Sequence, residues 1–247
     1  MWDDVWSRDT DHASEILKNR FTTEAYRQIR SFVSPADRSI LEAGCGTGRF
    51  ANLLGRDFPR SSVIGIDLSA SALLLAKKTN KEIGCKNVSF SQASLFSLPF
   101  PDDYFDFVFS EGVIQIFNPN CNPSDLDALK EMARVTKPGG KLLVSVINWF
   151  CFPHTFYKWN LHRRNLTYEY DFEKSYTHRE LRKLYIELGL QEISFSGYYP
   201  AYGFYRLSTR IRRFARLVHM FGALVDRIDS AWFARTFGFE IIAVGTK

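Results

Sequence analysis

Three glycines lie within five positions of the segment EAGCGTGRF, at Gly44, Gly46 and Gly48. Glycine-rich loops of this kind bring backbone N–H groups close to a bound nucleotide. A phosphate-binding P-loop requires Lys followed by Ser or Thr after its last glycine, where this chain has Arg49-Phe50. A dinucleotide site requires a third glycine at the position of Arg49. The spacing therefore disfavours both of these common nucleotide sites.

Two acids near this loop indicate which ligand it could hold. Asp67 ends the second apolar run of the chain, where an acid accepts hydrogen bonds from ribose hydroxyls or, alternatively, caps the next helix. Glu42 precedes a loop whose N–H groups would otherwise favour an anion. A carboxylate at this point suits a positively charged ligand better than a pyrophosphate. S-adenosylmethionine fits this description, because it carries a ribose, a sulfonium and an ammonium group but no phosphate.

The elements that must position these residues alternate between strands and helices. Strands are expected over 39–44, 62–67, 87–93, 105–112, 141–148, 191–197 and 239–246, and helices over 12–33, from the loop to about 58, and over 69–84, 123–140 and 177–190. Ser69 and Gly84 are placed to cap the 69–84 helix, and Thr177 and Glu180 have the spacing of a capping box at the start of the 177–190 helix. The run Pro138-Gly139-Gly140 is expected to end the 123–140 helix. This alternation predicts an α/β fold with a mostly parallel, doubly wound sheet.

The composition narrows the class of protein. Of 247 residues, 45% are apolar and 24% charged, and no apolar run approaches the roughly 20 residues that span a bilayer. The first residues are polar and acidic, unlike a signal peptide. The four cysteines are scattered, and neither they nor the histidines have metal-ligand spacing. We therefore expect reduced thiols, a cytoplasmic location and no metal site.

The positive charge of the chain is concentrated in residues 201–238. This segment holds seven arginines and two acids, which account for the whole net charge of +5. Its large apolar residues recur at alternating steps of four and three: Leu207, Ile211, Phe214, Val218, Phe221, Val225, Ile228 and Trp232. The spacing predicts an amphipathic helical hairpin broken at Gly222. The hairpin could pack on its own domain, contact a membrane surface or a lipid-linked acceptor, bind an anionic substrate, or form a homodimer contact. Nucleic acid is not an expected partner, because no RNA- or DNA-binding motif accompanies the charge.

Four segments resemble, in order and in spacing, the motifs of class I S-adenosylmethionine-dependent methyltransferases, above all the ubiquinone/menaquinone type. They are ILEAGCGTGRF, VIGIDLS, LPFPDDYFDFVFS and ARVTKPGGKLLVS. The resemblance covers residues 36–148 and, more loosely, 177–198 and 239–247. It implies a Rossmann-like sheet of seven strands with an antiparallel last strand and helical insertions. It also implies methyl transfer from S-adenosylmethionine to a small-molecule acceptor.

The resemblance also implies a set of cofactor-binding residues: Glu42, Gly44, Cys45, Gly46, Gly48, Asp67, Leu68, Ser94, Leu95 and Ser110. The glycines would admit the methionine part of the cofactor, with Glu42 on its ammonium side. Asp67 would bind both ribose hydroxyls, and Leu68 would flank the adenine. Ser94 and Leu95 occupy a position where relatives often have Asp-Ala, and that Asp commonly accepts from the adenine amine. Ser110 would lie near the methionine carboxylate and the transferred methyl.

A catalytic base is not evident from the sequence, because an activated methyl donor does not always require one. Glu111, beside Ser110, and His154 are the two candidates that we retain. We expect one domain over 1–247, with an N-terminal helical lid over 1–35 and insertions over 149–176 and 201–238 that shape the acceptor site. The aromatic residues of the first insertion favour a ring-bearing, glycan-like or lipid-linked acceptor. Two alternatives stay open: an NAD(P)-dependent oxidoreductase, and a non-catalytic scaffold that binds the adenosyl cofactor.

Overall fold

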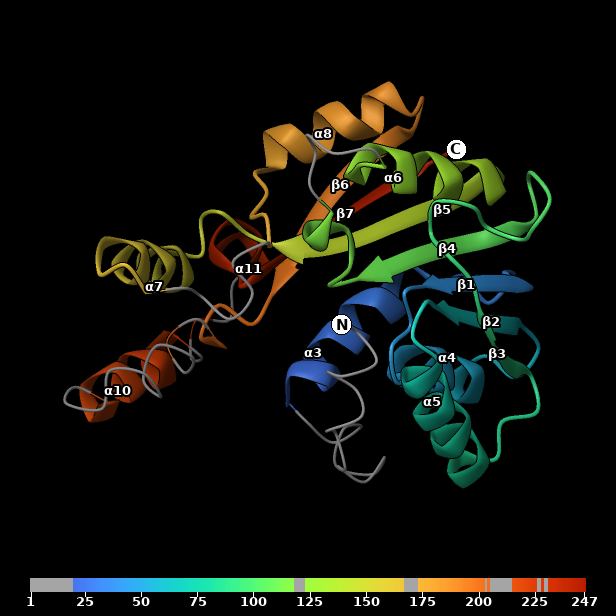
Figure 1. Ribbon diagram of the computed structural model, residues 1–247, viewed down its shortest axis with the longest axis horizontal. Helices are drawn as coiled ribbons and strands as arrows, with labels where there is room; N and C mark the ends of the chain where they lie inside the picture. Colours follow the sequence, from blue (N-terminus) through green and yellow to red (C-terminus); the bar gives the residue numbers. More distant parts are fainter. Residues whose placement is uncertain are drawn as a thin grey trace.

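The computed structural model describes residues 20–117, 123–166, 173–202, 204, 215–225, 228 and 231–247. Its centre is a seven-stranded sheet in the order β3-β2-β1-β4-β5-β7-β6 (Figure 1). The strands are β1 (Ser39–Ala43), β2 (Ser62–Asp67), β3 (Val88–Gln92), β4 (Phe105–Glu111), β5 (Thr136–Ile147), β6 (Gln191–Tyr198) and β7 (Glu240–Thr246). The first five strands pair in parallel, and β7 is antiparallel to both β5 and β6. The predicted mostly parallel sheet with an antiparallel last strand is confirmed.

Helices cover both faces of this sheet. On one face lie α3 (Arg20–Phe32), α4 (Arg49–Asp57) and α5 (Ala70–Ile83), and on the other lie α6 (Asp125–Val135) and α8 (His178–Glu187) (Figure 1). Successive side chains of a strand point to opposite faces. Phe107 and Phe109 of β4 therefore pack with α4, whereas Val108 packs with α6 in a second apolar cluster. The apolar run of β4 thus fills both layers of the core.

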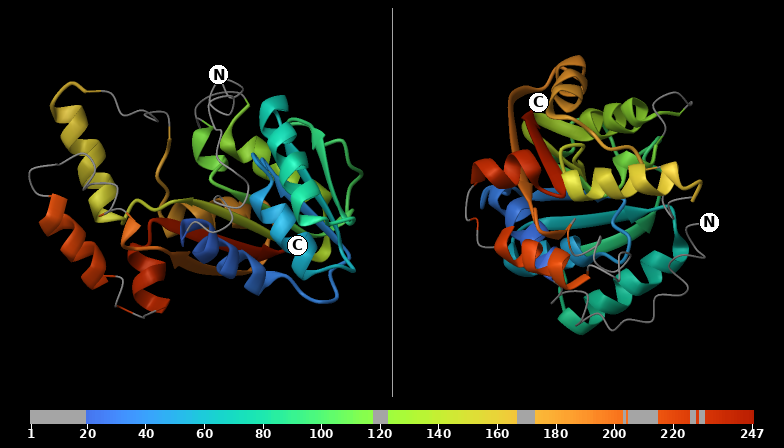
Figure 2. Two further views of the ribbon diagram at one scale, coloured as in Figure 1. Left: turned by 90° about the horizontal axis from the view of Figure 1, so that it is seen from below. Right: turned by 90° about the vertical axis from the view of Figure 1, so that its left-hand side faces the viewer.

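Three further helices lie beyond the carboxyl ends of the central strands. They are α7 (Phe152–Arg163), α10 (Ala215–Val225) and α11 (Ala231–Phe237). Figures 1 and 2 show α7 and α10 next to each other on the side toward which β4 and β5 point. Both predicted insertions therefore lie at the edge of the sheet where ligands of this fold class bind.

Local capping explains several helix ends. The Ser69 hydroxyl accepts from the N–H of Ala72 at 3.2 Å, and Gly84 ends α5 with a φ of 81°. Thr177 and Glu180 form the capping box that begins α8. The predicted caps of both helices are confirmed.

The prediction of a helix up to Gly140 is wrong, because α6 ends at Val135 and β5 begins at Thr136. The backbone N–H groups of Asp103 and Tyr104 donate to the last carbonyls of α6, those of Arg134 and Val135, at 3.0 and 2.9 Å. The helix therefore ends on tertiary hydrogen bonds. The Pro-Gly-Gly run lies instead inside β5, at a register shift against β4.

The expected break at Gly222 is also wrong, because α10 continues through Gly222 to Val225. Residues Leu207, Ile211 and Phe214 of the predicted stripe lie outside the described residues. Phe221, Ile228 and Trp232 are exposed, whereas Val218 is half-buried and Val225 packs against the core, so the described part of the stripe is only partly buried on its own domain.

Candidate functional site

The glycine loop joins β1 to α4 at the point where the strand order reverses between β1 and β4. All three glycines have left-handed backbones, with φ values of 80°, 50° and 68°. The N–H groups of Gly44 and Cys45 both donate to the Ile66 carbonyl at 2.8 Å, which fixes the loop against β2. A Cβ atom at Gly48 would lie 2.6 Å from the Phe90 ring. The loop therefore requires glycine for its conformation and, at Gly48, for packing against the Phe90 ring.

Asp67 lies at the end of β2, directly beside this loop. Its Oδ2 accepts from the Gly46 N–H at 2.8 Å, and its Oδ1 accepts from the Ser69 N–H at 2.9 Å. A carboxylate has about four lone-pair positions, so each oxygen can still accept from a ribose hydroxyl. The neighbouring Leu68 is 59% exposed and offers an apolar surface for an adenine ring. This donor and acceptor set fits the nucleoside of S-adenosylmethionine.

The loop that holds Ser94 and Leu95 runs alongside Asp67, because the Ala93 N–H donates to the Asp67 carbonyl at 3.1 Å. The Ser94 hydroxyl accepts from the Phe96 N–H, and Leu95 is buried in the core. These positions therefore lie beside Asp67.

Glu42 has a structural contact that the sequence did not predict. Its side chain is buried, and one carboxylate oxygen accepts from the Ala51 N–H in the first turn of α4 at 2.7 Å. Burial raises the pKa of Glu42, while the Ala51 N–H and the nearby Arg49 charge lower it. Burial prevails, so the pKa of Glu42 stays well above its ordinary value, and Glu42 accepts one of the free N–H groups in the first turn of α4.

Ser110 is fully buried in β4. Its hydroxyl donates to the Ala43 carbonyl at 2.7 Å and ties β4 to the end of β1. This hydrogen bond stabilises the strand pair directly below the glycine loop. The next residue, Glu111, ends β4 at the edge of the sheet.

Glu111 belongs to a buried polar network that sequence reasoning missed. Its Oε2 pairs with Nη2 of Arg49 at 2.7 Å, and its Oε1 lies 3.3 Å from the Tyr198 hydroxyl. Tyr198 also donates to Oε2 of Glu240 at 2.7 Å, and the Ser145 hydroxyl donates to the same oxygen at 2.6 Å. We call these five residues the Glu111 network. They come from α4, β4, β5, β6 and β7, so only the folded sheet brings them together.

One sequence feature could have indicated the network. Glu240 is the single acid in the otherwise apolar FEIIAVGT strand, and an unpaired acid in a buried strand is costly. In the structure Glu240 is 3% exposed. Burial and the nearby Glu111 charge raise the pKa of Glu240 to about 8.

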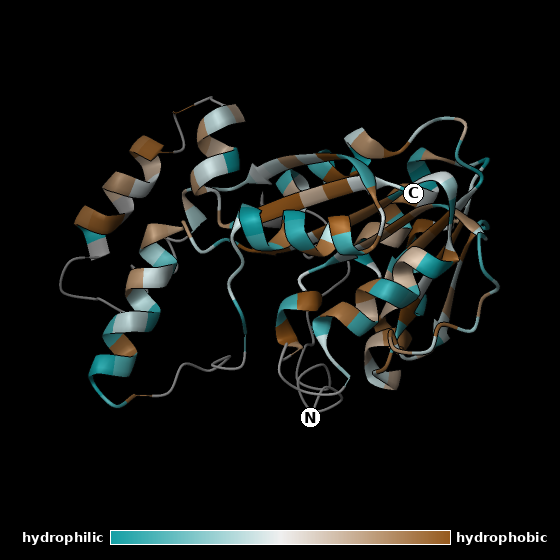
Figure 3. Cartoon of the chain, turned by 90° about the horizontal axis from the view of Figure 1, so that it is seen from above, coloured by the Kyte–Doolittle hydropathy of each residue, from teal (hydrophilic) through white to brown (hydrophobic). Residues whose placement is uncertain are grey.

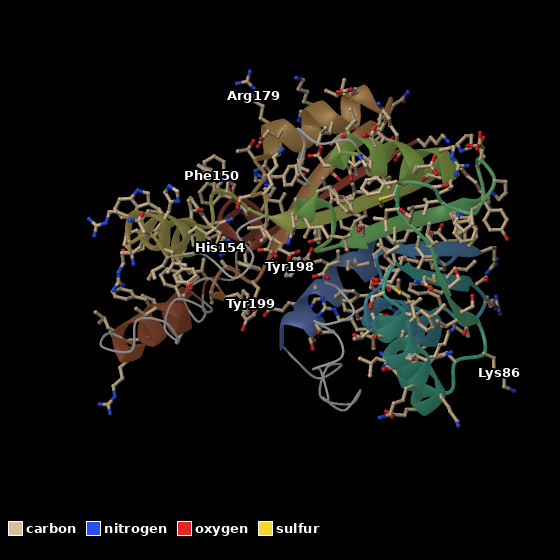
Figure 4. The ribbon with its side chains drawn as sticks, viewed as in Figure 1. Lys86, Phe150, His154, Arg179, Tyr198 and Tyr199 are labelled. Atoms are coloured by element: carbon tan, nitrogen blue, oxygen red, sulfur yellow. The ribbon has the colours of Figure 1, made fainter. Side chains whose placement is uncertain are left out.

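His154, the second candidate base, lies outside this network. It is buried in α7, and its ring packs edge-on against Phe239 with centroids 5.4 Å apart. Phe239 directly precedes Glu240, so His154 is one layer removed from the network, where the sheet meets α7 (Figure 4). The structure therefore does not bring the two predicted catalytic candidates together.

The described part of the chain contains no cluster of three or more His, Cys, Asp or Glu side chains that could hold a metal ion. Cys45, Cys85 and Cys151 are free thiols, and Cys121 lies outside the described residues. None of the described helices is both long enough and apolar enough to cross a membrane.

Known proteins resemble the middle part of this chain in sequence. Residues 35–184 match the family described as "Methyltransferase domain". The chain is 30% identical over 125 residues to a fatty-acid O-methyltransferase of Mycolicibacterium smegmatis. This alignment covers 51% of the present chain and 43% of the relative. It is 38% identical over 107 residues to a demethylmenaquinone methyltransferase of Lactococcus lactis, covering 42% and 40%. The matched region thus spans about two fifths of the length of these curated relatives.

The solved structures extend the likeness to the whole fold. A SAM-dependent methyltransferase of Thermotoga maritima superposes over 100% of both chains, with a TM-score of 0.67 and 18% identity. At this identity the superposition bears on the fold alone, and it agrees with the sheet order described above. The family match covers more than half of the chain. The chain therefore belongs to the methyltransferase domain family, with the fold of the class I S-adenosylmethionine-dependent methyltransferases.

Proposed function

We propose that this chain transfers a methyl group from S-adenosylmethionine to a small-molecule acceptor. The observation that carries the proposal is the hydrogen bond between the Gly46 N–H and the Asp67 carboxylate, which joins the glycine loop to a ribose-binding acid. When bound, the cofactor supplies a methyl group already activated by its sulfonium. The residues of this chain then have to bind and orient the cofactor and the acceptor, and to exclude water from the site. An oxidoreductase is disfavoured by Arg49, which stands where a dinucleotide site requires a glycine.

Each site residue has a role in this proposal. The loop Gly44-Cys45-Gly46 and Gly48 admit the methionine part, with Glu42 beneath it. Asp67 holds the ribose hydroxyls, Leu68 covers the adenine, and the backbone at Ser94 and Leu95 borders it. Ser110 fixes the end of β4 against β1 through its hydrogen bond to the Ala43 carbonyl. Glu111 faces the methyl group and the acceptor. His154 of α7 is the second candidate base and would lie next to the acceptor.

The acceptor side of the site carries an unusual surface. We call residues 149–166, 215–225 and 231–237 the apolar lobe. Large apolar side chains of this lobe are exposed: Trp149, Phe150, Phe152, Phe156, Trp159, Leu166, Leu217, Met220, Phe221, Leu224, Trp232 and Phe237. Figure 3 shows hydrophobic colouring along much of α10 and on parts of α7, away from the core. Apolar patches of this extent mark an interaction surface.

The charge of the apolar lobe indicates the kind of surface that it meets. The lobe contains five basic residues and no acid: Lys158, Arg163, Arg164, Arg216 and Arg235. Exposed Trp and Phe beside Lys and Arg suit the interface of an anionic lipid bilayer, where each basic residue contributes about 1 kcal/mol. We therefore propose that the apolar lobe, together with the rest of the 201–238 segment, contacts an anionic membrane surface and that the acceptor is lipid-linked.

Vesicle co-sedimentation tests the membrane contact. The full chain should bind phosphatidylserine-containing vesicles at low salt, bind more weakly at high salt, and bind phosphatidylcholine vesicles weakly. The double variant Phe152→Ser/Trp159→Ser should lose this binding, because both side chains are exposed. Ile186→Ser is the matched control, since Ile186 is 63% exposed on α8, outside the lobe.

The other partners considered for this segment give different results. A homodimer contact would show as concentration-dependent sedimentation that the double variant abolishes without vesicles. A small anionic substrate would leave vesicle binding absent in every variant. Either outcome contradicts the membrane contact. Transfer of labelled methyl from S-adenosylmethionine into a lipid extract tests the activity itself, and label confined to water-soluble products would contradict a lipid-linked acceptor.

The organisation of the chain completes the proposal. We propose one domain over 1–247 in the cytoplasm, with the insertions shaping the acceptor site. Within the 1–35 segment, the Tyr26 hydroxyl donates to Oδ2 of Asp57 at 2.8 Å and lies 3.0 Å from the Leu53 carbonyl. These contacts hold α3 on α4.

A further inference from the structure

A further pocket lies where α8 and α11 both pack on β6. It has a volume of about 580 Å³, and its lining includes His178, Arg179 and Arg182 of α8, Phe195 of β6 and Arg235 of α11. We call it the arginine pocket. Because β6 is the outermost strand of the sheet, β5 and β7 separate it from β4. The arginine pocket is therefore distinct from the candidate cofactor site at the glycine loop.

The arginine pocket concentrates positive charge without an acid to balance it. None of the described residues that line it is acidic, and none of its three arginines has an ion-pair partner within the described part of the chain. Two acids on the same elements have other partners. Glu180 accepts from the Thr177 hydroxyl at 2.8 Å, and Glu192 accepts from the Thr246 hydroxyl at 3.1 Å. The guanidinium charges of the pocket thus remain available to a ligand.

The positions of these charges are unfavourable unless an anion offsets them. Arg179 lies in the first turn of α8, where the helix dipole disfavours a cation. Arg182 follows three positions later and therefore lies on the same face of the helix. Arg235 faces the pocket from α11, so like charges gather there from two elements. An anion among the three guanidiniums would offset their mutual repulsion.

Phe195 orients the basic side chains. The Arg182 guanidinium lies over its ring, 5.2 Å from the centroid, and the His178 ring packs edge-on against it with centroids 5.1 Å apart. The Arg235 backbone hydrogen-bonds to the His178 ring, which ties α11 to α8. A guanidinium stacked on an aromatic ring is already oriented, so it loses less conformational freedom when its N–H groups bind a ligand.

The donors of the pocket indicate the class of anion. Nε2 of His178 is buried and has no hydrogen-bond partner among the described residues, although an unpaired buried polar atom is costly. Guanidinium groups present paired N–H donors that match phosphate oxygens. A phosphate group carries about two negative charges and three acceptor oxygens, which suits several cations better than one carboxylate does. We propose that the arginine pocket binds a phosphate group, supplied either by the headgroup of an anionic lipid or by a free phosphate ester.

The pocket is accessible to such a ligand. Arg179, Arg182 and Arg235 are exposed, and Figure 4 shows Arg179 at the outer surface of the molecule. Arg235 also belongs to the apolar lobe, so the pocket borders the proposed membrane contact. The proposal does not depend on methyl transfer, because no residue of the pocket belongs to the glycine loop or to the Glu111 network.

NMR of the arginine Nε–Hε groups of the full chain, titrated with inorganic phosphate at constant ionic strength, tests the proposal. The signals of Arg179, Arg182 and Arg235 should shift together and saturate with one dissociation constant. Arg182→Gln should weaken the affinity about 10-fold or more, because it removes a charged donor. Arg182→Lys should also weaken it, since an ammonium keeps the charge but lacks the planar fork. Lys183→Gln is the matched control, because it removes one charge from the next position of α8, outside the pocket, and should change the affinity less than about 2-fold.

Vesicle binding distinguishes the two sources of the phosphate group. If the source is a lipid headgroup, the chain should prefer phosphatidic acid vesicles to phosphatidylserine vesicles of equal surface charge. Arg182→Gln should then lose this preference while it still binds both kinds of vesicle. If the source is a free phosphate ester, inorganic phosphate should bind saturably and the preference for phosphatidic acid should be absent.

Shifts of the three arginine signals that do not saturate, or equal losses of affinity in Arg182→Gln and Lys183→Gln, would overturn the phosphate site. Arg235→Gln is a second variant on another element, and unchanged phosphate affinity in it would also contradict the pocket. The titration requires no cofactor. Its failure therefore leaves the proposed methyl transfer intact, and failure of S-adenosylhomocysteine to bind leaves the phosphate site intact.

Discussion

The N–H of Gly46 donates to Oδ2 of Asp67 at 2.8 Å, although the two residues are 21 positions apart. This hydrogen bond joins the loop after β1 to the end of β2. It leaves the carboxylate partly exposed beside Leu68, with lone pairs still available for a ligand. The loop and the acid therefore form one preorganised site.

Removing this carboxylate should weaken cofactor binding. Asp67→Ala deletes the proposed acceptor of the ribose hydroxyls, and a hydrogen bond to a charged group contributes about 1.5–3 kcal/mol. We expect the affinity for S-adenosylhomocysteine to fall about 10- to 100-fold in isothermal titration calorimetry. Asp102→Ala, at an exposed turn position, should bind as wild type does. Unchanged affinity in Asp67→Ala would rule out the ribose assignment.

The packing around Gly48 predicts a large loss of stability on substitution. A Cβ at Gly48 would lie 2.6 Å from the Phe90 ring and 2.8 Å from the Ala76 side chain, at a φ of 68°. Backbone strain and overpacking together should lower the free energy of unfolding of Gly48→Ala by about 2–5 kcal/mol in urea titration.

Gly84→Ala provides the matched comparison for Gly48→Ala. Gly84 has a φ of 81°, and a Cβ there would meet nothing within 4 Å. Only the backbone strain of a positive φ applies at this position. We therefore expect Gly84→Ala to lower the free energy of unfolding by about 1–2 kcal/mol. Equal losses in the two variants would show that the Phe90 contact is unimportant.

Asp106 should make the fold sensitive to acid. Partial burial raises its pKa, but hydrogen bonds from Lys137, Ser39 and the Arg38 backbone outweigh burial and lower the pKa to about 2. The pKa of this carboxyl is depressed on folding, so its stabilisation is complete above about pH 4 and is lost as pH falls toward 2. Asp106→Asn should cost about 1–2 kcal/mol near neutral pH and less as the pH approaches 2. The free energy of unfolding of wild type and of Asp106→Asn is measured at pH 2.5 and at pH 6. An equal difference between the two proteins at both pH values would contradict this role.

A buried hydrogen bond anchors the segment that leads into α8. The Tyr176 hydroxyl donates to Oδ2 of Asp125 at 2.7 Å, and both residues are buried. Tyr176→Phe leaves the carboxylate short of a donor and should cost about 1.5–3 kcal/mol in the free energy of unfolding. Tyr104→Phe should change the stability by less than about 0.5 kcal/mol, because the Tyr104 side chain is 45% exposed. Similar losses in both variants would point to a general effect of removing a hydroxyl.

The part of the fold that the sequence predicted best is the part specified locally. The loop from Gly44 to Gly48, the cap at Ser69 and the capping box at Thr177 each depend on residues a few positions apart. The end of α6 was not predictable in this way. Its last carbonyls accept from the N–H groups of Asp103 and Tyr104, which lie some 30 residues earlier in the chain.

The polar network of the site was missed for the same physical reason. Ser145, Tyr198 and Glu240 become neighbours only because β7 inserts between β5 and β6 in the sheet. No short spacing in the sequence records that order. The charge of the 201–238 segment was visible in the sequence, whereas the exposed aromatic residues of α7 that extend the same surface became evident only in the fold.

Calorimetric titration of the full chain with S-adenosylhomocysteine and, separately, with NAD and NADP tests the central claim most directly. The account predicts saturable binding of S-adenosylhomocysteine with one site per chain, weakened in Asp67→Ala, and no binding of either dinucleotide. Saturable binding of NAD or NADP without binding of S-adenosylhomocysteine would contradict it.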